Sequence, residues 1–256
     1  MGKRKGLKSG ATIESWDVSS LHEYMELVNR IADSDAMPPA LFRGQRTDFP
    51  LLPKLARLYN DGRLKGGFRE SETSMLQQFA RQGCIFVMNE HTSWDWLATA
   101  QHHGMATRLL DWTENPLLAL WFAVQRAPDG DKPGVVWIFN PSKEDYVDSV
   151  FEESPFSLGR TRVFLPRHSN MRLRVQSGRF TVHHFRETDG RFIPLEKHSR
   201  YRRQLKKVRI RSDAFSQMRC DLDRCGVNAG TMFPDLAGLA QHVEWQFSFL
   251  DDEQTI

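Results

Sequence analysis

The feature that most constrains this chain is an apolar segment near its middle. Asn115 and Pro116 have the cap and first-turn preferences of a helix start, and the next eight residues, LLALWFAV, are apolar on every side. A helix without a polar face is buried inside a domain. Shortly afterwards, the run 134–139, GVVWIF, predicts a strand. The chain therefore has to fold around a central helix with a buried strand close to it.

The patterns on either side mix helices and strands without a regular alternation, which favours an α+β fold with a mixed central sheet and flanking helices. Ser20 and Glu23 form a capping-box pattern, and Ser93 and Ser212 are expected to cap two later helices. The expected helices are 21–32, 70–80, 94–102, 212–224 and one after Phe233-Pro234, and the expected strands are 40–43, 172–184 and 207–211.

Composition indicates a single packed domain. The chain has 256 residues, of which 40% are hydrophobic and 11% aromatic, enough for one large core. We expect a basic, flexible segment 1–18, a domain 19–249 and an acidic tail 250–256. The three cysteines lack paired metal spacing, and no apolar run reaches the about 18 residues of a membrane span. We therefore expect a cytoplasmic protein without a bound metal or a membrane anchor.

Positive charge is concentrated in the segment 160–211. Thirteen arginines and three lysines stand there against three carboxylates, a net charge of +13, whereas the whole chain carries only +3. Such a segment is a candidate for contact with the phosphates of a nucleotide or a nucleic acid. A solvated basic face, or a cover for the acidic remainder of the chain, explains the charge equally well.

The first candidate binding element is Phe42-Arg43-Gly44-Gln45. An unpaired buried guanidinium is costly, so Arg43 in an apolar strand either has a buried acidic partner, such as Asp111, or points to a ligand. Gly44 has no side chain and would let a ligand or another strand approach the backbone.

The second candidate element is the polar stretch 101–113, at a junction between two apolar helices. Buried polar groups left unpaired cost about 1–3 kcal/mol each, so these side chains bind one another or a ligand. Arg108 and Asp111 have the spacing of an internal ion pair, an interpretation at least as good as a catalytic role. His102 and His103 are adjacent and cannot form the i,i+4 pair of a metal-binding helix, so we expect one of them to line a cleft.

The third candidate element is RVQSGRF, residues 174–180. Gln176, between Arg174 and a Ser-Gly turn, can orient a ligand but cannot act as a general base. A plain hairpin edge is the alternative interpretation. The standard glycine-rich phosphate loops and the common hydrolase, kinase and zinc motifs are missing from the sequence.

These elements together resemble one protein family. FRGQ, LLPKLAR, QHHGMATRLLDWTENPLLALWFAV, RVQSGRF and GTMFPDLAGLA are similar to the FRG domain family, named for its Phe-Arg-Gly element, from about Ala40 to Leu239. The family occurs in bacteria and phages, often beside defence or mobile-element genes, and its biochemical activity is poorly defined. The resemblance implies a bacterial protein, as a toxin or an anti-phage effector.

An aromatic-Arg-Gly element on an early strand is also similar to the first motif of mono-ADP-ribosyltransferases. This resemblance implies an ADP-ribosyltransferase-like fold and an enzyme, a transferase or glycohydrolase, that binds nicotinamide adenine dinucleotide (NAD). Arg43 would hold the dinucleotide. The glutamate of those enzymes has no match here, so the catalytic candidates are His102, His103 and Gln176. The other expected cofactor contacts are Gly44, Gln45, Thr107, Arg108, Asp111, Thr113 and Arg174.

Two other functions fit the same sequence. The segment 160–211 could follow the phosphates of a nucleic acid, with Trp94, Trp96 and Trp112 stacking on the bases, in a binding module or a nuclease. The third interpretation is a non-catalytic interaction or sensor domain. If the chain is an enzyme or a nucleic-acid-binding module, a partner protein could regulate it. Substrate, acceptor and oligomeric state are not encoded in any motif of this sequence.

Overall fold

The computed structural model describes residues 12–32, 37–87, 92–148, 154–166, 177–186 and 190–253. Its helices are α1 (Leu21–Ile31), α2 (Lys54–Asn60), α3 (Phe68–Gly83), α4 (Ser93–His102), α5 (Pro116–Val124), α7 (Phe215–Arg224), α8 (Ala229–Met232) and α9 (Leu236–Phe247). Its strands are β1 (Ser15–Val18), β2 (Leu41–Gln45), β3 (Leu109–Thr113), β4 (Gly134–Phe139), β5 (Arg162–Phe164), β6 (Gly178–Val182), β7 (Phe185–Arg186), β8 (Arg191–Phe192) and β9 (Leu205–Ile210).

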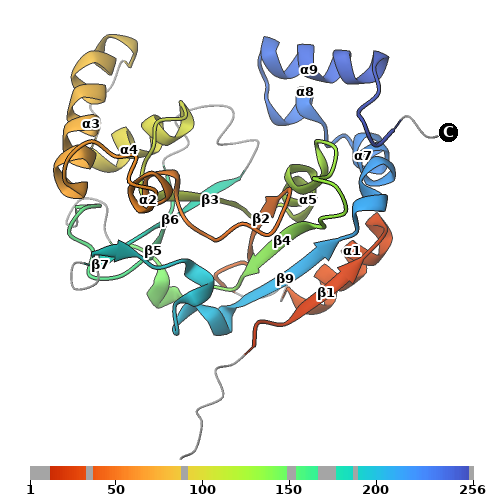
Figure 1. The fold of residues 1–256 in the computed structure, drawn as a ribbon, viewed down its shortest axis with the longest axis horizontal. Coiled ribbons are helices and arrows are strands. Elements are labelled where there is room, and N and C mark those ends of the chain that lie inside the picture. The colour runs from red at the N-terminus through yellow and green to blue at the C-terminus, as the bar shows by residue number, and fades with distance from the viewer. Residues whose placement is uncertain are drawn as a thin grey trace, which may run out of the picture.

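Seven strands form one twisted central sheet in the order β1-β9-β4-β2-β3-β6-β5 (Figure 1). The edge strand β1 runs parallel to β9, and the other neighbouring pairs are antiparallel. The short strands β7 and β8 make a separate hairpin. This architecture confirms the predicted α+β fold with a mixed sheet.

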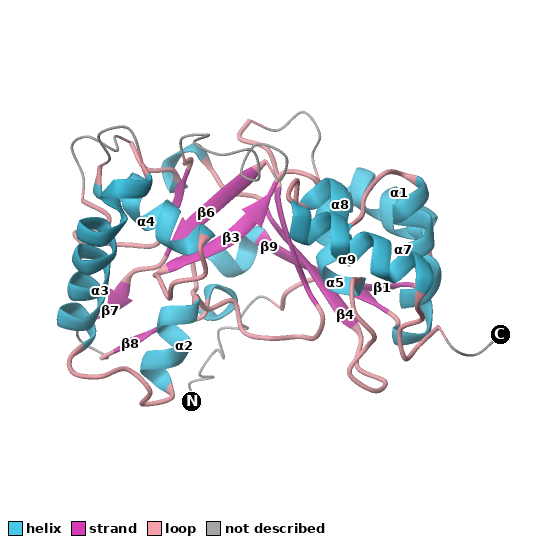
Figure 2. Ribbon diagram, turned by 90° about the horizontal axis from the view of Figure 1, so that it is seen from above, coloured by secondary structure: helices cyan, strands magenta, loops and turns pink. Residues whose placement is uncertain are grey.

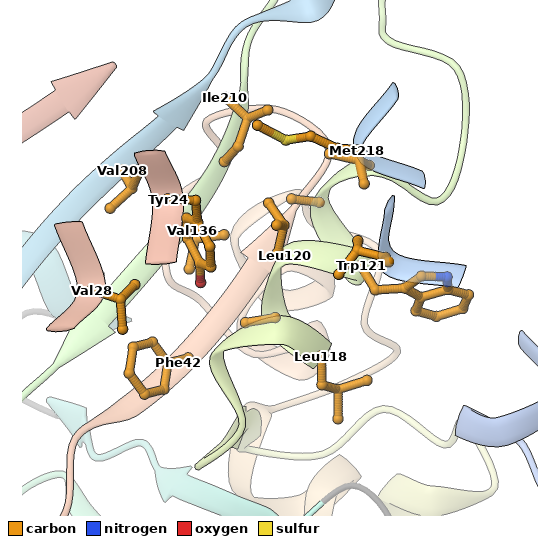
Figure 3. Packing of buried hydrophobic residues seen from close by; sticks show 14 of the residues in the cluster. Tyr24, Val28, Phe42, Leu118, Leu120, Trp121, Val136, Val208, Ile210 and Met218 are labelled. Carbon is orange, nitrogen blue, oxygen red and sulfur yellow. The ribbon is translucent and has the colours of Figure 1, made fainter. Parts of the chain in front are cut away.

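Helix α5 is the centre of the larger core, as its apolar sequence predicts. The Asn115 side chain caps it by accepting hydrogen bonds from the backbone N–H groups of Leu117 and Leu118. Six of its nine residues are buried. They pack against β2, β4 and β9 on one side and against α1 and α7 on the others (Figure 3). The Tyr24 hydroxyl of α1 donates to the Pro116 carbonyl at 2.8 Å and ties the two helices together.

A second group of helices covers the other half of the sheet. Trp94 and Leu97 of α4 pack with Leu76 of α3 against apolar side chains of β3, β5 and β6. Seen from above, the two helix groups stand apart over one face of the sheet, with β3 and β6 visible between them (Figure 2). The opposite face is covered by loops and short helical turns, which bury Leu51, Leu195 and Tyr201.

The two halves of the sheet meet at a weak junction between β2 and β3. These strands pair at a single position, Phe42 with Thr113, whereas β2 pairs with β4 at five positions and β3 with β6 at five. Beyond that position the strands diverge. Arg43, the residue after Phe42, lies where the ladder is lost.

Several helix starts differ from the predictions. Thr92, not Ser93, caps α4, through a reciprocal box with Asp95. Ser212 caps no helix: it lies in a short 3-10 turn, Ser212–Ala214, and α7 begins after it. The Glu23 side chain bonds to Ser19, so the expected capping box is only half formed.

The structure describes part of the predicted segment 1–18 and part of the predicted tail 250–256. Ser15–Val18, inside the segment 1–18, form the edge strand β1. Asp252 and Glu253, inside the tail 250–256, bind Arg219 of α7. Of the expected strand 172–184, residues 172–176 lie outside the described residues and 178–182 form β6.

Candidate functional site

Arg43 bridges the diverging strands β2 and β3. Its Nη1 donates a hydrogen bond of 2.8 Å to the Asp111 carbonyl oxygen, in place of a ladder bond, and lies 3.7 Å from the Asp111 carboxylate. The side chain is 21% exposed, and its buried Nε has no hydrogen-bond partner. The predicted Arg43–Asp111 pairing is therefore present, but it satisfies only part of the guanidinium.

Asp111 is held from a second direction by α4. The side-chain nitrogen of Gln101 donates a 2.9 Å hydrogen bond to the Asp111 carboxylate. The side-chain oxygen of Gln101 accepts a 2.6 Å hydrogen bond from the Thr107 hydroxyl. Thr107 is buried and also accepts from the Leu109 backbone N–H. The Asp111 side chain is nevertheless 57% exposed. We call Arg43, Arg57, Gln101, Thr107 and Asp111 the Arg43 cluster.

Burial and neighbouring charges both act on the ionisable groups in and around the Arg43 cluster. Burial lowers the pKa of Arg43, the Asp111 carboxylate opposes this, and the charge of Arg57 on α2 adds to it. Lys54, one helical turn before Arg57, donates to the Gly104 carbonyl at 2.8 Å. Burial also lowers the pKa of His183 to about 3, with the charges of Arg43 and Arg108 acting in the same direction. Burial is the larger cause at both residues, and the neighbouring positive charges add to it.

Three of the residues expected to contact a cofactor take part in contacts within the fold. A Cβ atom on Gly44 would lie 1.8 Å from the Ala119 carbonyl oxygen, so Gly44 lets α5, and not a second strand, approach β2. Gln45 is buried and accepts a 3.2 Å bond from the Trp137 indole. The buried Thr113 hydroxyl accepts from the Asn115 backbone N–H at the turn into α5.

Arg108 points away from Asp111, which corrects the predicted internal pair. Arg108 lies just before β3, and its side chain extends to α3, whereas Asp111 lies within the strand and bonds to α4. Arg108 binds both oxygens of Glu72 on α3, with a 2.7 Å bond from Nε to Oε1, and lies between the rings of Phe68 and Phe156. Both charged side chains are at most 4% exposed. The pair joins α3 to the start of β3 and forms the base of a 460 Å³ cavity.

The two histidines lie at the end of α4, with their rings 4.9 Å apart and almost perpendicular. His103 is exposed and lines a 580 Å³ cavity that is mainly apolar, together with Phe79, Trp96 and other residues of α3 and α4. The structure therefore places His103 at a cavity, as expected, but not in the hydrogen-bond network of Arg43. Arg174 and Gln176 lie outside the described residues.

Six of the thirteen described cations of the segment 160–211 form ion pairs with acidic residues of the chain that the structure records. The pairs are Arg162–Asp148, Arg179–Glu114, Arg200–Asp145, Lys207–Asp48, Arg209–Asp17 and Arg211–Asp213. These partners come from elements spread along the sheet, so much of the segment's charge is neutralised locally. This arrangement agrees with the interpretation of the segment as a cover for the acidic remainder.

Sequence reasoning did not single out Arg57, Gln101 or His183. Arg57 and Lys54 stand three apart after a proline, which is a usable signal for one face of a helix. Gln101 ends the helix whose partner strand carries Asp111, but only the fold brings the two side chains together. Within the ranges that the structure describes, there is no cluster of three potential metal-ligating side chains and no helix that could span a membrane.

Residues 38–132 match the model of the FRG domain family. The match confirms the resemblance seen in the sequence, and it covers the strand of Arg43, the polar stretch 101–113 and α5. It ends in the loop before β4, so RVQSGRF and GTMFPDLAGLA lie beyond it. No curated protein and no solved structure matches the chain.

Proposed function

We propose that this chain, which contains an FRG domain, binds a phosphate-bearing nucleotide at the Arg43 cluster, with NAD as the leading candidate. The observation that carries the proposal is the incomplete pairing of Arg43. Its buried Nε has no partner, and its hydrogen bond within the described residues goes to a main-chain carbonyl. A phosphate would supply the missing acceptors, because arginine binds this group through two parallel hydrogen bonds.

The surroundings of Arg43 suit such a ligand. Arg57 adds a second positive charge that acts on Arg43, and Asp111 presents an exposed carboxylate beside them. A carboxylate accepts hydrogen bonds from ribose hydroxyls, whereas the two guanidinium groups attract phosphate. One nucleotide could therefore use both kinds of side chain.

The resemblance to mono-ADP-ribosyltransferases extends this proposal to a reaction. The bond between nicotinamide and ribose would break, nicotinamide would leave with the bonding electrons, and the ribose carbon would bond to water or to an acceptor nucleophile. Positive charge develops on the ribose in such a step, and a nearby carboxylate stabilises it. Asp111 is the candidate for that role on the described strands, and the activity would suit a toxin or an anti-phage effector.

Calorimetric titration of the purified protein with NAD, ADP-ribose and pyrophosphate tests the binding proposal. Arg43→Gln should weaken binding about 10-fold to 100-fold, because a hydrogen bond to a charged group contributes about 1.5–3 kcal/mol. The exposed Arg57→Gln should weaken it in the same direction without affecting folding. Arg209→Gln, which removes an exposed arginine paired with Asp17, is the matched control.

The proposal fails if the wild-type protein binds none of the three ligands, or if the Arg43, Arg57 and Arg209 variants bind them equally. The reaction is tested separately by measuring free nicotinamide. Asp111→Asn keeps an oxygen that accepts a hydrogen bond from a ribose hydroxyl, so binding should weaken less than in Arg43→Gln, whereas the release of nicotinamide should be lost.

A further inference from the structure

Helix α9 contacts the rest of the molecule through the side that carries Gly238, His242 and Trp245. Gly238 packs against Phe233 and Ala229, where a Cβ atom would lie 2.1 Å from the Phe233 carbonyl oxygen. His242 lies 3.8 Å from the Asp223 carboxylate of α7, and the Trp245 indole donates to Glu253 at 3.3 Å. Because successive helical residues turn by about 100°, these three residues lie on one side of α9.

The opposite side of α9 is apolar and exposed. Leu236 is 84% exposed, Leu239 51%, Val243 43% and Phe247 87%. Their spacing of three, four and four residues places them in one stripe along the helix, with the exposed Ala240 beside it. A helix of a monomeric protein normally turns such a stripe toward the core. Here the helix lies at the outside of the molecule, above α8 and away from the sheet (Figure 1).

The charges of α9 favour a protein partner over a membrane. The helix contains no lysine or arginine, and its ionisable side chains are those of His242 and Glu244. Helices that lie on membranes combine an apolar face with lysines and arginines that contact anionic lipids. Two uncharged apolar stripes can pack against each other without repulsion between like charges. The same stripe on a second copy of the chain is therefore a suitable partner.

The stripe is complementary to itself in an antiparallel arrangement. With the two helices centred on each other, Leu236 of one copy faces Phe247 of the other, Ala240 faces Val243, and Leu239 lies opposite Glu244. Large side chains then pair at both ends, and small ones in the middle allow close approach. Such a contact is isologous and closes as a dimer with twofold symmetry.

We propose that the outward face of α9 is the interface through which two copies of this chain form an antiparallel dimer. The helix has 12 residues and is about 18 Å long, so it provides a smaller surface than a standard protein interface. We expect a dissociation constant of about 1–100 μM, in the range of weak, reversible association. The interface is separate from the Arg43 cluster and does not depend on the function proposed for it.

Sedimentation of the purified full chain tests the dimer, from about 1 μM to about 1 mM protein, a range chosen to span the expected dissociation constant. The wild-type protein should shift from monomer to dimer as concentration rises. Val243→Lys, at the middle of the stripe, should remain monomeric throughout. Ala237→Lys adds the same charge on the same helix about 120° from the centre of the stripe, and it should dimerise like the wild type.

Both positions are exposed, so thermal unfolding should give similar midpoints for the two variants and show that folding is unaffected. The proposal is overturned if the wild-type protein stays monomeric over the range, or if Ala237→Lys prevents association as strongly as Val243→Lys. Binding of a monomeric wild-type chain to anionic lipid vesicles would overturn it in favour of a membrane contact.

Discussion

His183 is a buried histidine between two arginines. It follows β6, is 1% exposed, and its Nε2 lies 3.1 Å from the Thr181 hydroxyl, which in turn accepts from the Trp112 indole at 3.0 Å. Its Nδ1 has no partner. Burial, with the charges of Arg43 and Arg108, lowers the pKa of His183 to about 3. The imidazole is therefore neutral in the folded protein at neutral pH.

At this residue we predict a loss of stability in mild acid. An unfolded histidine has a pKa of about 6.5. Below that pH, His183 is protonated in the unfolded chain but stays neutral in the folded chain. The stabilisation is complete above pH 6.5 and falls as the pH approaches 3, by up to about 1.4 kcal/mol per pH unit. In urea denaturation between pH 7.5 and 4.5, the free energy of unfolding should depend less steeply on pH for His183→Gln than for the wild-type protein. Equal slopes for the two proteins would contradict the prediction.

At the scale of elements, α5 and β2 approach each other closely at one glycine. The two elements meet at Gly44, where the Ala119 backbone occupies the space of a side chain. This approach places α5 directly on the strand that carries Arg43. The next side chain along β2, that of Gln45, points to the other face of the sheet and bonds to Trp137.

Gly44→Ala should destabilise the fold by about 3 kcal/mol or more, because an added methyl group would overlap the Ala119 carbonyl and force α5 away from the sheet. The matched control is Gly159→Ala, where a Cβ atom meets nothing within 4 Å, and its effect should stay within about 0.5 kcal/mol. Chemical denaturation measures both. A similar small effect for both variants would show that the contact relaxes easily.

The sequence predicts these elements where a local pattern decides the structure. Asn115-Pro116 and the apolar run after them give α5, and GVVWIF gives β4, because caps and burial are written in neighbouring residues. The partners of Arg43 and Arg108 follow from strand order and from the loss of pairing between β2 and β3, which no neighbouring residue encodes. For this reason the polar stretch 101–113 predicted side chains that bond to one another or to a ligand, but the internal pair of Arg108 and Asp111 that it suggested is not formed, and Arg108 binds Glu72.

At the scale of the whole molecule, ion pairs join segments that are distant in sequence. Near the C-terminal end, Arg219 of α7 forms a buried group of such ion pairs, and its side chain is 4% exposed. It donates to the Val124 carbonyl at the end of α5 at 2.8 Å, to Asp252 at 2.7 Å and to Glu253 at 2.8 Å. One side chain therefore connects the central helix to residues near the end of the chain.

Arg219→Met should destabilise the protein by about 3 kcal/mol, because it leaves two partly buried carboxylates without their cation. Adding Asp252→Asn and Glu253→Gln to this variant should recover part of the loss. Arg211→Met, which breaks the exposed pair with Asp213, is expected to cost less than about 1 kcal/mol. Equal losses for the Arg219 and Arg211 variants in urea denaturation would disprove the difference that burial makes.

The single paired position between β2 and β3 also has a mechanical meaning. A rotation of one half of the sheet against the other breaks few backbone hydrogen bonds at this position, whereas elsewhere in the sheet it would break a full ladder. The two halves are therefore held together at this junction mainly by side chains, which are the buried cluster beneath the sheet and the Arg43 side chain that crosses from β2 to Asp111. A group that binds Arg43 and Asp111 together would add a link between the two halves at the position where the backbone supplies the fewest.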